Sequence, residues 1–368
     1  MKKIFFLLFF VFSRAVYSFE LNSKNAVLMD AETGEVLFDK NADERSMPSS
    51  MTKIMTSYLV FEALENGKIS LTDSFFVSPR AWKQEGSRTF LMVNTKVPVE
   101  DLVKGLVIQS GNDAAITLAE GMAGSVEAFV DLMNIKASEL KLKNTNFTNP
   151  IGFNEGDHYM SVKDIAILSE NLIKNFPQYY TYFSTPSFTY NNITQPNRNL
   201  LLKIYQGADG IKTGHTEDAG YGLASSAIRD NRRLIAVVNG ASSDLERAEE
   251  CKVLLDYGFL TLTRQELYPS YKPISTLKVK YGKPNTVDVI AKENVLITTK
   301  NPNGVTTEIV LETNLKAPIS KDTKIGTIKV KSDISEKTYD LYPANDIESV
   351  GFIKKFFLAI LYFLRIIK

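Results

Sequence analysis

Cysteine and histidine are scarce in this 368-residue chain, and its positive and negative charges almost cancel. The single cysteine, Cys251, cannot form an internal disulfide, and its helix-like surroundings predict a buried structural residue. The two histidines, His158 and His215, are far apart and lack the ligand spacing of a zinc site, so we expect no metal and no other cofactor. The formal net charge of +1 gives no reason to expect a nucleic-acid partner.

Long hydrophobic runs are also missing, because no stretch approaches the ~20 apolar residues that a membrane-spanning helix needs. The amino-terminal run is short: two lysines precede the apolar residues 4–12, and small residues follow up to Ser18. This pattern is typical of a secretory signal peptide, which we place at residues 1–18. An uncleaved anchor is the alternative, and in both cases the body of the chain leaves the cytoplasm.

The carboxyl-terminal segment, residues 346–368, is rich in aromatic and aliphatic residues, and four lysines and arginines interrupt it. Lys354 and Arg365 are eleven residues apart and therefore fall on nearly the same face of a helix. This spacing predicts an amphipathic anchor that lies in the membrane interface, with its cations toward anionic lipid head groups. A helix docked on its own domain and a spanning helix with snorkelling lysines are the alternatives.

Between these ends the sequence pattern changes once, near Arg264. The length favours two domains. We expect a mixed helix-and-strand domain at residues 19–262 and a β-rich domain at residues 263–345, where strand patterns and turns recur without a helical run. We expect one helix to begin at Ser49 or Ser50 and further helices to cover residues 99–108, 113–122, 128–140, 162–173 and 245–259. We expect a pair of strands within residues 26–38 and further strands at 188–191, 199–204, 210–214, 221–228 and 232–239.

Three short motifs stand in order along the first domain: Ser50-Met51-Thr52-Lys53, Ser110-Gly111-Asn112 and Lys212-Thr213-Gly214. Any one of them alone predicts no more than a helix cap or a turn. Together, at a helix start, in a loop between two helices and on a strand, they nearly match the set known from penicillin-binding proteins and class A β-lactamases, in which the middle motif reads S-D-N and not S-G-N.

The residue types in these motifs suit acyl transfer. Ser50 is a poor nucleophile until a base takes its proton, and Lys53 lies three residues away on the same helix face. Lys53 can be that base only when it is neutral, and burial together with a nearby cation such as Lys212 would lower its pKa. Ser110 can relay a proton toward the leaving amine, and Asn112 can hold both Lys53 and the substrate amide.

The third motif predicts a substrate-binding strand. An extended peptide can pair with the strand that carries Lys212, Thr213 and Gly214, where glycine keeps side-chain bulk out of the cleft and threonine adds a hydroxyl donor. Backbone N–H groups of Ser50 and His215 are the expected oxyanion donors.

Over nearly its whole length the chain resembles the low-molecular-mass penicillin-binding proteins of the D-alanyl-D-alanine carboxypeptidase family. Besides the motifs, the segments 195–199 and 209–221 carry this resemblance. It implies an α+β fold: a serine β-lactamase-like or penicillin-binding-protein-like catalytic domain, with an antiparallel sheet and a helical cluster, followed by a small all-β domain. It also implies that Arg198 and Arg247 help to hold the terminal carboxylate of the substrate, a role that suits the bidentate guanidinium.

The function implied is removal of the terminal D-alanine from peptidoglycan pentapeptides through a Ser50 acyl-enzyme. The partners implied are peptidoglycan stem peptides, β-lactams as covalent inhibitors, and the periplasmic face of a bacterial inner membrane.

Several alternatives remain open. A DD-endopeptidase would use the same machinery, and a wall-binding scaffold would keep the motifs without turnover. A class A β-lactamase needs a Glu in an E-x-x-L-N context, and residues 139–143 miss its final Asn by one place. A Ser-His-Asp hydrolase would need a G-x-S-x-G elbow, which does not surround Ser50. We therefore interpret His215 as part of the cleft wall and His158 as structural.

Overall fold

The computed structural model describes residues 20–312 and 314–363. Within this range the chain forms two compact units, one of residues 20–29 and 38–257 and the other of residues 30–37 and 258–363. The predicted signal peptide, residues 1–18, lies outside the described residues, as does the end of the predicted anchor from residue 364 onward.

The first unit is built on a five-stranded sheet with the strand order β2-β1-β11-β10-β9. Strand β10 is antiparallel to both β9 and β11, and Asp230 and Asn231, each with a positive φ, form the predicted hairpin turn. Strand β9 is at the edge of this sheet, so one side of its backbone has no neighbouring strand there. The strands are β1 (Asn25–Asp30), β2 (Glu35–Lys40), β9 (Ala208–Thr216), β10 (Gly220–Arg229) and β11 (Arg232–Ala241).

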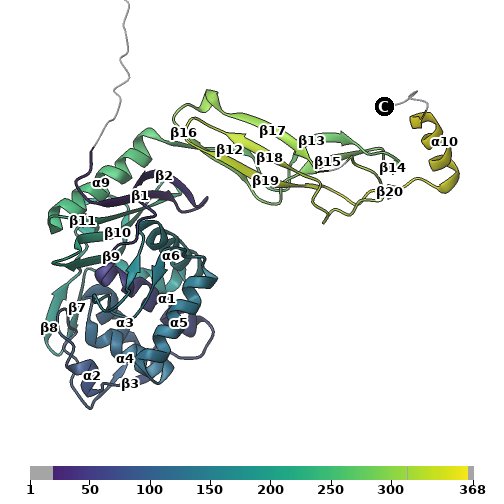
Figure 1. Ribbon diagram of the computed structural model, residues 1–368. Coiled ribbons are helices and arrows are strands. Elements are labelled where there is room, and N and C mark those ends of the chain that lie inside the picture. The colour runs from purple at the N-terminus through teal and green to yellow at the C-terminus, as the bar shows by residue number, and fades with distance from the viewer. Residues whose placement is uncertain (1–19, 313, 364–368) are drawn as a thin grey trace, which may run out of the picture. The chain divides into compact units, whose positions relative to one another are not determined.

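Helices cover both faces of this sheet (Figure 1). Helix α9 (Asp244–Thr261) lies on one face, and α1 (Lys53–Glu65) and α6 (Val162–Asn175) lie on the other. Cys251 of α9 points into the sheet, where its thiol is 3.6 Å from the carbonyl oxygen of Leu223, and burial raises its pKa to about 12. Cys251 is thus the buried structural residue that the sequence predicts.

The helical cluster is centred on α1, which is buried on almost every side because apolar residues occupy all of its faces. Ser125 and Ser161 cap the following helices α5 and α6 through their side-chain oxygens. The cluster also contains α2 (Pro79–Trp82), α3 (Val99–Ile108), α4 (Asn112–Ala123), α5 (Val126–Glu139), α7 (Pro177–Tyr180), α8 (Leu201–Ile204) and the 3₁₀ turns η1 (Ser49–Thr52) and η2 (Thr181–Ser184).

Three two-stranded antiparallel sheets border the cluster: β3 (Ser74–Phe76) with β4 (Lys96–Pro98), β5 (Thr145–Asn146) with β6 (Tyr159–Met160), and β7 (Ser187–Tyr190) with β8 (Ile193–Pro196).

One secondary-structure prediction is wrong: residues 199–204 contain the short helix α8 (Leu201–Ile204) and do not form a strand. The side chain of Asn199 explains the difference, because its Oδ1 accepts the N–H of Leu201 at 3.1 Å and so favours a helical turn. Its Nδ2 also donates to the carbonyl of Gly210 at 2.7 Å and ties this turn to the start of β9.

The second unit is all-β up to its last helix. A five-stranded sheet has the order β13-β15-β19-β18-β17, and two strand pairs, β12-β16 and β14-β20, accompany it. Val289, Ile297, Ile328 and Leu341 belong to its core cluster of buried apolar side chains. The elements are β12 (Thr263–Tyr268), β13 (Pro273–Lys278), β14 (Gly282–Lys283), β15 (Thr286–Ile290), β16 (Val295–Thr299), η3 (Pro302–Gly304), β17 (Thr306–Leu311), β18 (Gly326–Lys331), β19 (Glu336–Pro343) and β20 (Glu348–Ser349).

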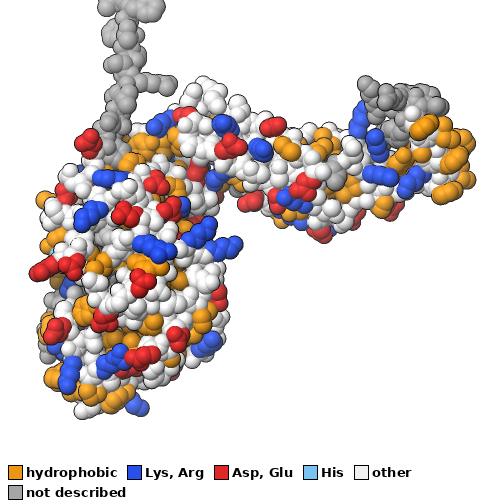
Figure 2. Space-filling model, viewed as in Figure 1, with side chains coloured by type: hydrophobic (Ala, Val, Ile, Leu, Met, Phe, Trp, Pro, Cys, Tyr) orange, Lys and Arg blue, Asp and Glu red, His pale blue; other side chains and the backbone are white. Residues whose placement is uncertain are grey.

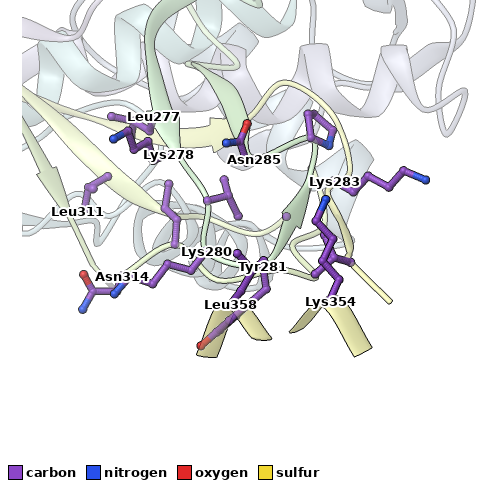
Figure 3. Close-up of a pocket in the computed structure, with 15 residues that line it drawn as sticks. Leu277, Lys278, Lys280, Tyr281, Lys283, Asn285, Leu311, Asn314, Lys354 and Leu358 are labelled. Carbon is purple, nitrogen blue, oxygen red and sulfur yellow. The ribbon is translucent and has the colours of Figure 1, made fainter. Parts of the chain in front are cut away.

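The unit ends in helix α10 (Phe352–Phe363), within the segment where the sequence predicts an amphipathic helix. Figure 2 shows hydrophobic side chains gathered over α10, with Lys and Arg side chains next to them. A cavity of about 730 Å³ opens beside this helix (Figure 3). Across residues 20–312 and 314–363, every helix is too short or too polar to cross a bilayer.

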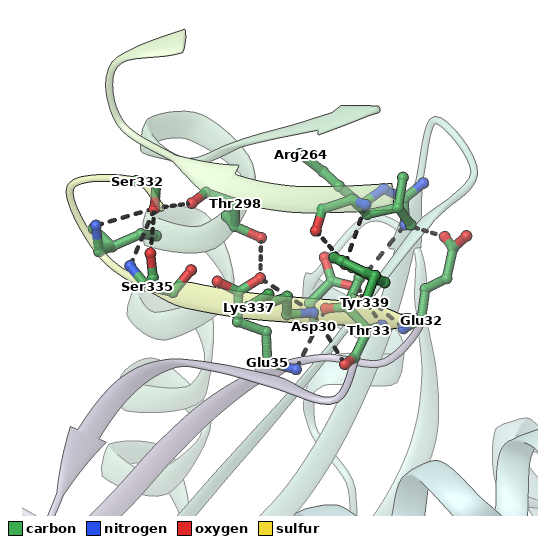
Figure 4. Close-up of polar contacts among 12 residues, drawn as sticks. Asp30, Glu32, Thr33, Glu35, Arg264, Thr298, Ser332, Ser335, Lys337 and Tyr339 are labelled. Carbon is green, nitrogen blue, oxygen red and sulfur yellow. Dashed lines mark hydrogen bonds and ion pairs between the residues drawn. The ribbon is translucent and has the colours of Figure 1, made fainter. Parts of the chain in front are cut away.

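The second unit also includes the distant segment 30–37, the turn between β1 and β2. Figure 4 shows how polar side chains hold this turn. Glu35 is buried, accepts the hydroxyl of Thr298 at 2.8 Å and lies 3.8 Å from the ammonium of Lys337. Arg264 forms an ion pair with Glu32. Contacts between residues so far apart in sequence give no local signal, which is why sequence patterns alone did not group them.

Candidate active site

The first motif forms a tight turn followed by a long helix. Sequence reasoning placed the helix start at Ser49 or Ser50; the structure forms the 3₁₀ turn η1 there and starts α1 at Lys53. The ammonium nitrogen of Lys53 lies 3.0 Å from Ser50 Oγ and donates to the carbonyl of Ile151 at 2.8 Å. The hydroxyl and the amine therefore form the hydrogen-bonded pair that a serine nucleophile and its base require.

Burial sets the charge of this lysine. The side chain of Lys53 is fully buried, and loss of hydration lowers its pKa to about 7, helped by the positive charge of Arg198 and opposed by Asp113. A lysine with this pKa is neutral in a substantial fraction of molecules at neutral pH and can accept a proton. Arg198 contributes a positive charge that lowers the pKa of Lys53, and Lys212, the cation that the sequence suggests, is coupled to Lys53 as well, since the charge of Lys53 helps to lower the pKa of Lys212.

The second motif connects α3 to α4. Ser110 has a φ of 62°, a left-handed conformation that is costly for a residue with a side chain and that often marks a functional site. Its hydroxyl is buried and has no hydrogen-bond partner among the described residues. An unpaired hydroxyl at this position is free to exchange a proton with a group that enters the site.

Asn112 is the first residue of α4. Its Nδ2 donates to the carbonyl of Glu85 at 2.7 Å, while its buried Oδ1 lacks a partner within the described part of the chain. The bond predicted between Asn112 and Lys53 is not formed, because the Lys53 ammonium is directed to Ser50 and to the carbonyl of Ile151. The unpaired amide oxygen remains suited to accept a substrate N–H.

Asp113, which sequence reasoning missed, supports this turn. The carboxylate is completely buried and accepts the backbone N–H groups of Thr89 at 2.8 Å and of Leu91 at 3.0 Å. These bonds join the segment before α3 to the start of α4 and so help to fix Ser110 and Asn112 in place.

The third motif lies on the edge strand β9. Lys212 is buried and donates to the carbonyl of Thr213 at 2.9 Å, and burial, more than the neighbouring cations, lowers the pKa of Lys212 well below its usual value. Gly214 lies against the nucleophile turn: a Cβ there would come within 2.8 Å of the Pro48 carbonyl oxygen and 3.2 Å of the Ser49 Cβ. Glycine is needed so that β9 can approach η1 this closely.

A cavity of about 330 Å³ brings the motifs together. Lys53, Asn112 and Lys212 are buried and do not form part of its wall. The lining residues come from all three motifs, from the two arginines and the histidine that the sequence predicts for this site, and from the loop before α3; they are Ser50, Gly86, Ser87, Ser110, Arg198, Thr213, Gly214, His215 and Arg247.

Two arginines add positive charge to this cavity in different ways. Arg198 is exposed and donates to the hydroxyl of Ser87 at 2.5 Å. Arg247 is buried, donates to the carbonyls of Gly214 at 2.8 Å and Gly222 at 3.1 Å, and pairs with Asp244. Arg198 is thus the more accessible cation, and Arg247 also braces β9 against β10.

His215 forms an exposed part of the cavity wall, as the sequence predicts. Its ring stacks on Tyr221, with ring centroids 3.9 Å apart. Within the residues that the structure describes, no three His, Cys, Asp or Glu side chains gather into a group that would hold a metal ion.

A loop that was not predicted from the sequence, residues 149–153, contacts the ammonium group of Lys53. Asn149 Oδ1 accepts the backbone N–H groups of Ile151 at 3.2 Å and Gly152 at 2.7 Å, and this turn presents the Ile151 carbonyl to Lys53. Gly152 has a φ of 91°, and a Cβ there would lie 1.8 Å from the Ser49 carbonyl oxygen. The Asn-Pro-x-Gly sequence at 149–152 is a turn signal from which this loop could have been predicted, although not its contact with Lys53.

His158 connects this loop to the first motif. Its Nε2 lies 2.9 Å from the hydroxyl of Thr52, and its Nδ1 accepts the backbone N–H of Thr148 at 3.1 Å. Because Nδ1 is an acceptor, the ring is neutral with its proton on Nε2. Burial lowers the pKa of His158 to about 4. The expectation of a structural histidine agrees with this geometry.

A serine whose hydroxyl bonds a buried lysine one turn away, beside a Lys-Thr-Gly edge strand, defines a serine hydrolase of the penicillin-binding class. The profile of the family described as D-alanyl-D-alanine carboxypeptidase matches residues 12–243, and that of the penicillin-binding protein 5 C-terminal domain matches residues 263–349. The chain belongs to the D-alanyl-D-alanine carboxypeptidase family. The family, fold class and enzyme class predicted from the sequence are therefore confirmed.

Individual relatives agree with this assignment. D-alanyl-D-alanine carboxypeptidase DacF of Bacillus subtilis is 41% identical over 84% of this chain and 82% of its own length. D-alanyl-D-alanine carboxypeptidase DacD of Escherichia coli is 36% identical over 90% of this chain and 88% of its own length. Among solved structures, penicillin binding protein 5 from Haemophilus influenzae matches with a TM-score of 0.85 and 38% identity, covering 91% of this chain and 100% of that chain.

Proposed function

We propose that the protein removes the terminal D-alanine from peptidoglycan pentapeptides by two-step acyl transfer, with Ser50 as the nucleophile. The observation that carries the proposal is the 3.0 Å contact between Ser50 Oγ and the fully buried Lys53 amine, at a cavity lined by residues of all three motifs. The family membership supports the same reaction.

In the acylation step, neutral Lys53 takes the proton of Ser50, and the hydroxyl oxygen attacks the carbonyl between the two terminal D-alanines. The backbone N–H groups of Ser50 and His215 stabilise the oxyanion. Ser110 passes a proton to the leaving amine, and its otherwise unpaired hydroxyl supports this role. D-alanine departs, and water then hydrolyses the acyl-enzyme.

Substrate binding uses the edge strand and the two arginines. The stem peptide pairs with the free side of β9 beside Thr213, where the sheet offers no other strand. Arg198 and Arg247 attract the terminal carboxylate, Arg198 as the exposed cation of the cavity wall. β-Lactams acylate Ser50 in place of the peptide.

The location that we propose rests on the sequence patterns near the two ends of the chain. We assign residues 1–18 as a signal peptide, residues 19–262 as the catalytic domain, residues 263–345 as the β-rich domain and residues 346–368 as a peripheral anchor on the periplasmic face of the inner membrane. The exposed aromatic and aliphatic side chains of α10 support the anchor, since water is a poor solvent for so much apolar surface.

Two assays on matched variants test the reaction. Ser50→Ala is expected to abolish D-alanine release from a pentapeptide and labelling by a fluorescent penicillin, because the acylated oxygen is gone. Ser49→Ala is the control, since the Ser49 hydroxyl contacts Thr216 and not Lys53. Labelling retained in Ser50→Ala would show that the nucleophile is wrong. Efficient cleavage of a cross-linked peptide, without release of the terminal D-alanine, would favour the endopeptidase.

A further inference from the structure

The β-rich unit contains a basic cavity that has no role in the reaction described above. Its volume is about 730 Å³, and Figure 3 shows the side chains around it. Four lysines line it, Lys278, Lys280, Lys283 and Lys354, and none of its lining residues is acidic. Helix α10 supplies Lys354 and Leu358, so the cavity adjoins the proposed membrane anchor.

Positive charge is concentrated further at the edge of this cavity. The ammonium groups of Lys316 and Lys355 lie over the ring of Tyr281, at 5.5 Å and 5.7 Å from its centroid. Tyr281 itself lines the cavity. Lys316 and Lys355 therefore add two cations to the four lysines of the wall.

Three of the four lysines in the wall differ from other lysines of the unit, which pair with carboxylates. Lys292 pairs with Asp322 at 2.9 Å, and Lys324 lies 3.0 Å from both Glu312 and Asp340. In the part of the chain that the structure describes, no such ion pair involves Lys278, Lys283 or Lys354. Three ammonium groups without a carboxylate partner among the described residues, around one concave surface, attract an anion.

The neighbouring face of α10 is apolar and exposed. Phe352, Ile353 and Phe363 are 86%, 74% and 86% exposed, and Phe356 and Phe357 are more than half exposed. A ligand that satisfies both surfaces carries an anionic group for the lysines and hydrocarbon for the helix. An anionic phospholipid has both, with the phosphate next to its acyl chains.

We propose that this cavity binds the phosphate head group of an anionic phospholipid while α10 lies in the interface of the same membrane. The inference rests on the proposed anchoring by α10 and adds a lipid preference to it. The β-rich unit then contacts the bilayer through its own lysines, in addition to the helix.

Vesicle binding by the mature chain tests the proposal. The cavity variant carries Lys278→Gln, Lys280→Gln and Lys283→Gln; the control carries Lys292→Gln, Lys324→Gln and Lys331→Gln, which removes the same charge from lysines that pair with acids. On phosphatidylcholine vesicles containing one quarter phosphatidylglycerol, we expect the cavity variant to bind at least about ten-fold more weakly, since each lysine near an anionic surface contributes several-fold. The control is expected to change by less than about two-fold, and both variants keep wild-type affinity for pure phosphatidylcholine and wild-type release of D-alanine.

Three outcomes would overturn the inference or its basis. If the cavity variant and the control lose the same affinity for anionic vesicles, the lysines act only through general electrostatic attraction and the cavity is not a binding site. Binding of inorganic phosphate to the wild type but not to the cavity variant, with equal affinity of the two for anionic vesicles, would show that the cavity takes free phosphate and not lipid. A third variant without residues 346–368 separates the two proposals. If this deletion variant still binds neutral vesicles, the anchor assignment fails. If the deletion abolishes binding but the cavity variant binds anionic vesicles as tightly as the wild type, the cavity proposal alone is refuted.

Discussion

Acidification is expected to destabilise this protein through one buried group, His158. The ring is neutral in the folded state because Nδ1 accepts the Thr148 N–H and burial lowers the pKa of His158 from 6.5 to about 4. In the unfolded chain the ring regains its ordinary pKa. Above pH 6.5 both states are neutral and the free energy of unfolding gains no pH dependence from His158. Between pH 6.5 and pH 4 the unfolded state binds a proton that the folded state does not, so stability is lost as the pH falls.

The magnitude follows from the difference between the two pKa values. A fall from 6.5 to about 4, at ~1.36 kcal/mol for each pH unit, removes about 3 kcal/mol from the free energy of unfolding. Lys53 affects stability at higher pH than His158. Because its pKa in the folded state is about 7, the stability that Lys53 costs as the pH falls is almost fully lost before pH 6.5. Burial raises the pKa of Asp164, which opposes the loss, but a comparison of two variants cancels this contribution.

Urea unfolding of the wild type and of His158→Gln, measured from pH 7.5 to pH 4.5, isolates the effect. At pH 7.5 the variant is expected to be less stable by about 1–2 kcal/mol, because the Thr148 N–H loses its acceptor. The variant has no titrating ring, so by pH 4.5 the wild type loses about 2.5 kcal/mol relative to it and the order of stability reverses. A difference that stays constant over this pH range would refute the account of His158 as a buried neutral ring.

Further predictions concern the active site. The kcat/KM for D-alanine release is expected to rise with pH around a midpoint near 7, because Lys53 must be neutral to act as the base; a flat profile from pH 5.5 to 8.5 would exclude this role. Arg198→Gln is expected to move that midpoint to higher pH and Asp113→Asn to lower pH, since the first removes a positive and the second a negative charge that acts on Lys53; shifts in the same direction would contradict the electrostatic assignment. Ser110→Ala is expected to lower kcat by about 10²-fold or more with little change in KM, as measured by steady-state kinetics, and an unchanged kcat would remove Ser110 from the proton path.

The nucleophile and its base could be predicted from the sequence because they are local. Ser50 and Lys53 are separated by one helical turn, and any helical start at this position brings their side chains together. The exact form of that start, a 3₁₀ turn before α1, depends on packing against β9 and the loop at 149–153, which the local sequence does not specify.

The surroundings of the lysine could not be predicted in the same way. The Ile151 carbonyl, the Asp113 carboxylate and the Arg198 guanidinium reach Lys53 or its neighbours from distant segments. The motif pattern suggested Lys212 as a charge that lowers the Lys53 pKa; in the structure burial is the main cause of both lowered pKa values, and the charge of Lys53 also lowers the pKa of Lys212. The exposed arginine keeps its charge.

Local competition also explains the helix α8. The sequence at 199–204 was interpreted as a strand, whereas the side chain of Asn199 favours a helical turn because its Oδ1 accepts the N–H of Leu201. Similarly, the turn at 30–37 belongs to the β-rich unit through buried Glu35 and its partner Thr298, and only the folded chain reveals this pairing.

The chemistry of Cys251 offers an experimental opportunity. The chain has no other cysteine, and this one is buried with a thiol that stays protonated at any ordinary pH. Maleimide dyes will therefore leave the native protein unmodified. A cysteine introduced on the surface becomes a unique attachment point for a fluorophore or spin label, without any need to first engineer a thiol-free background.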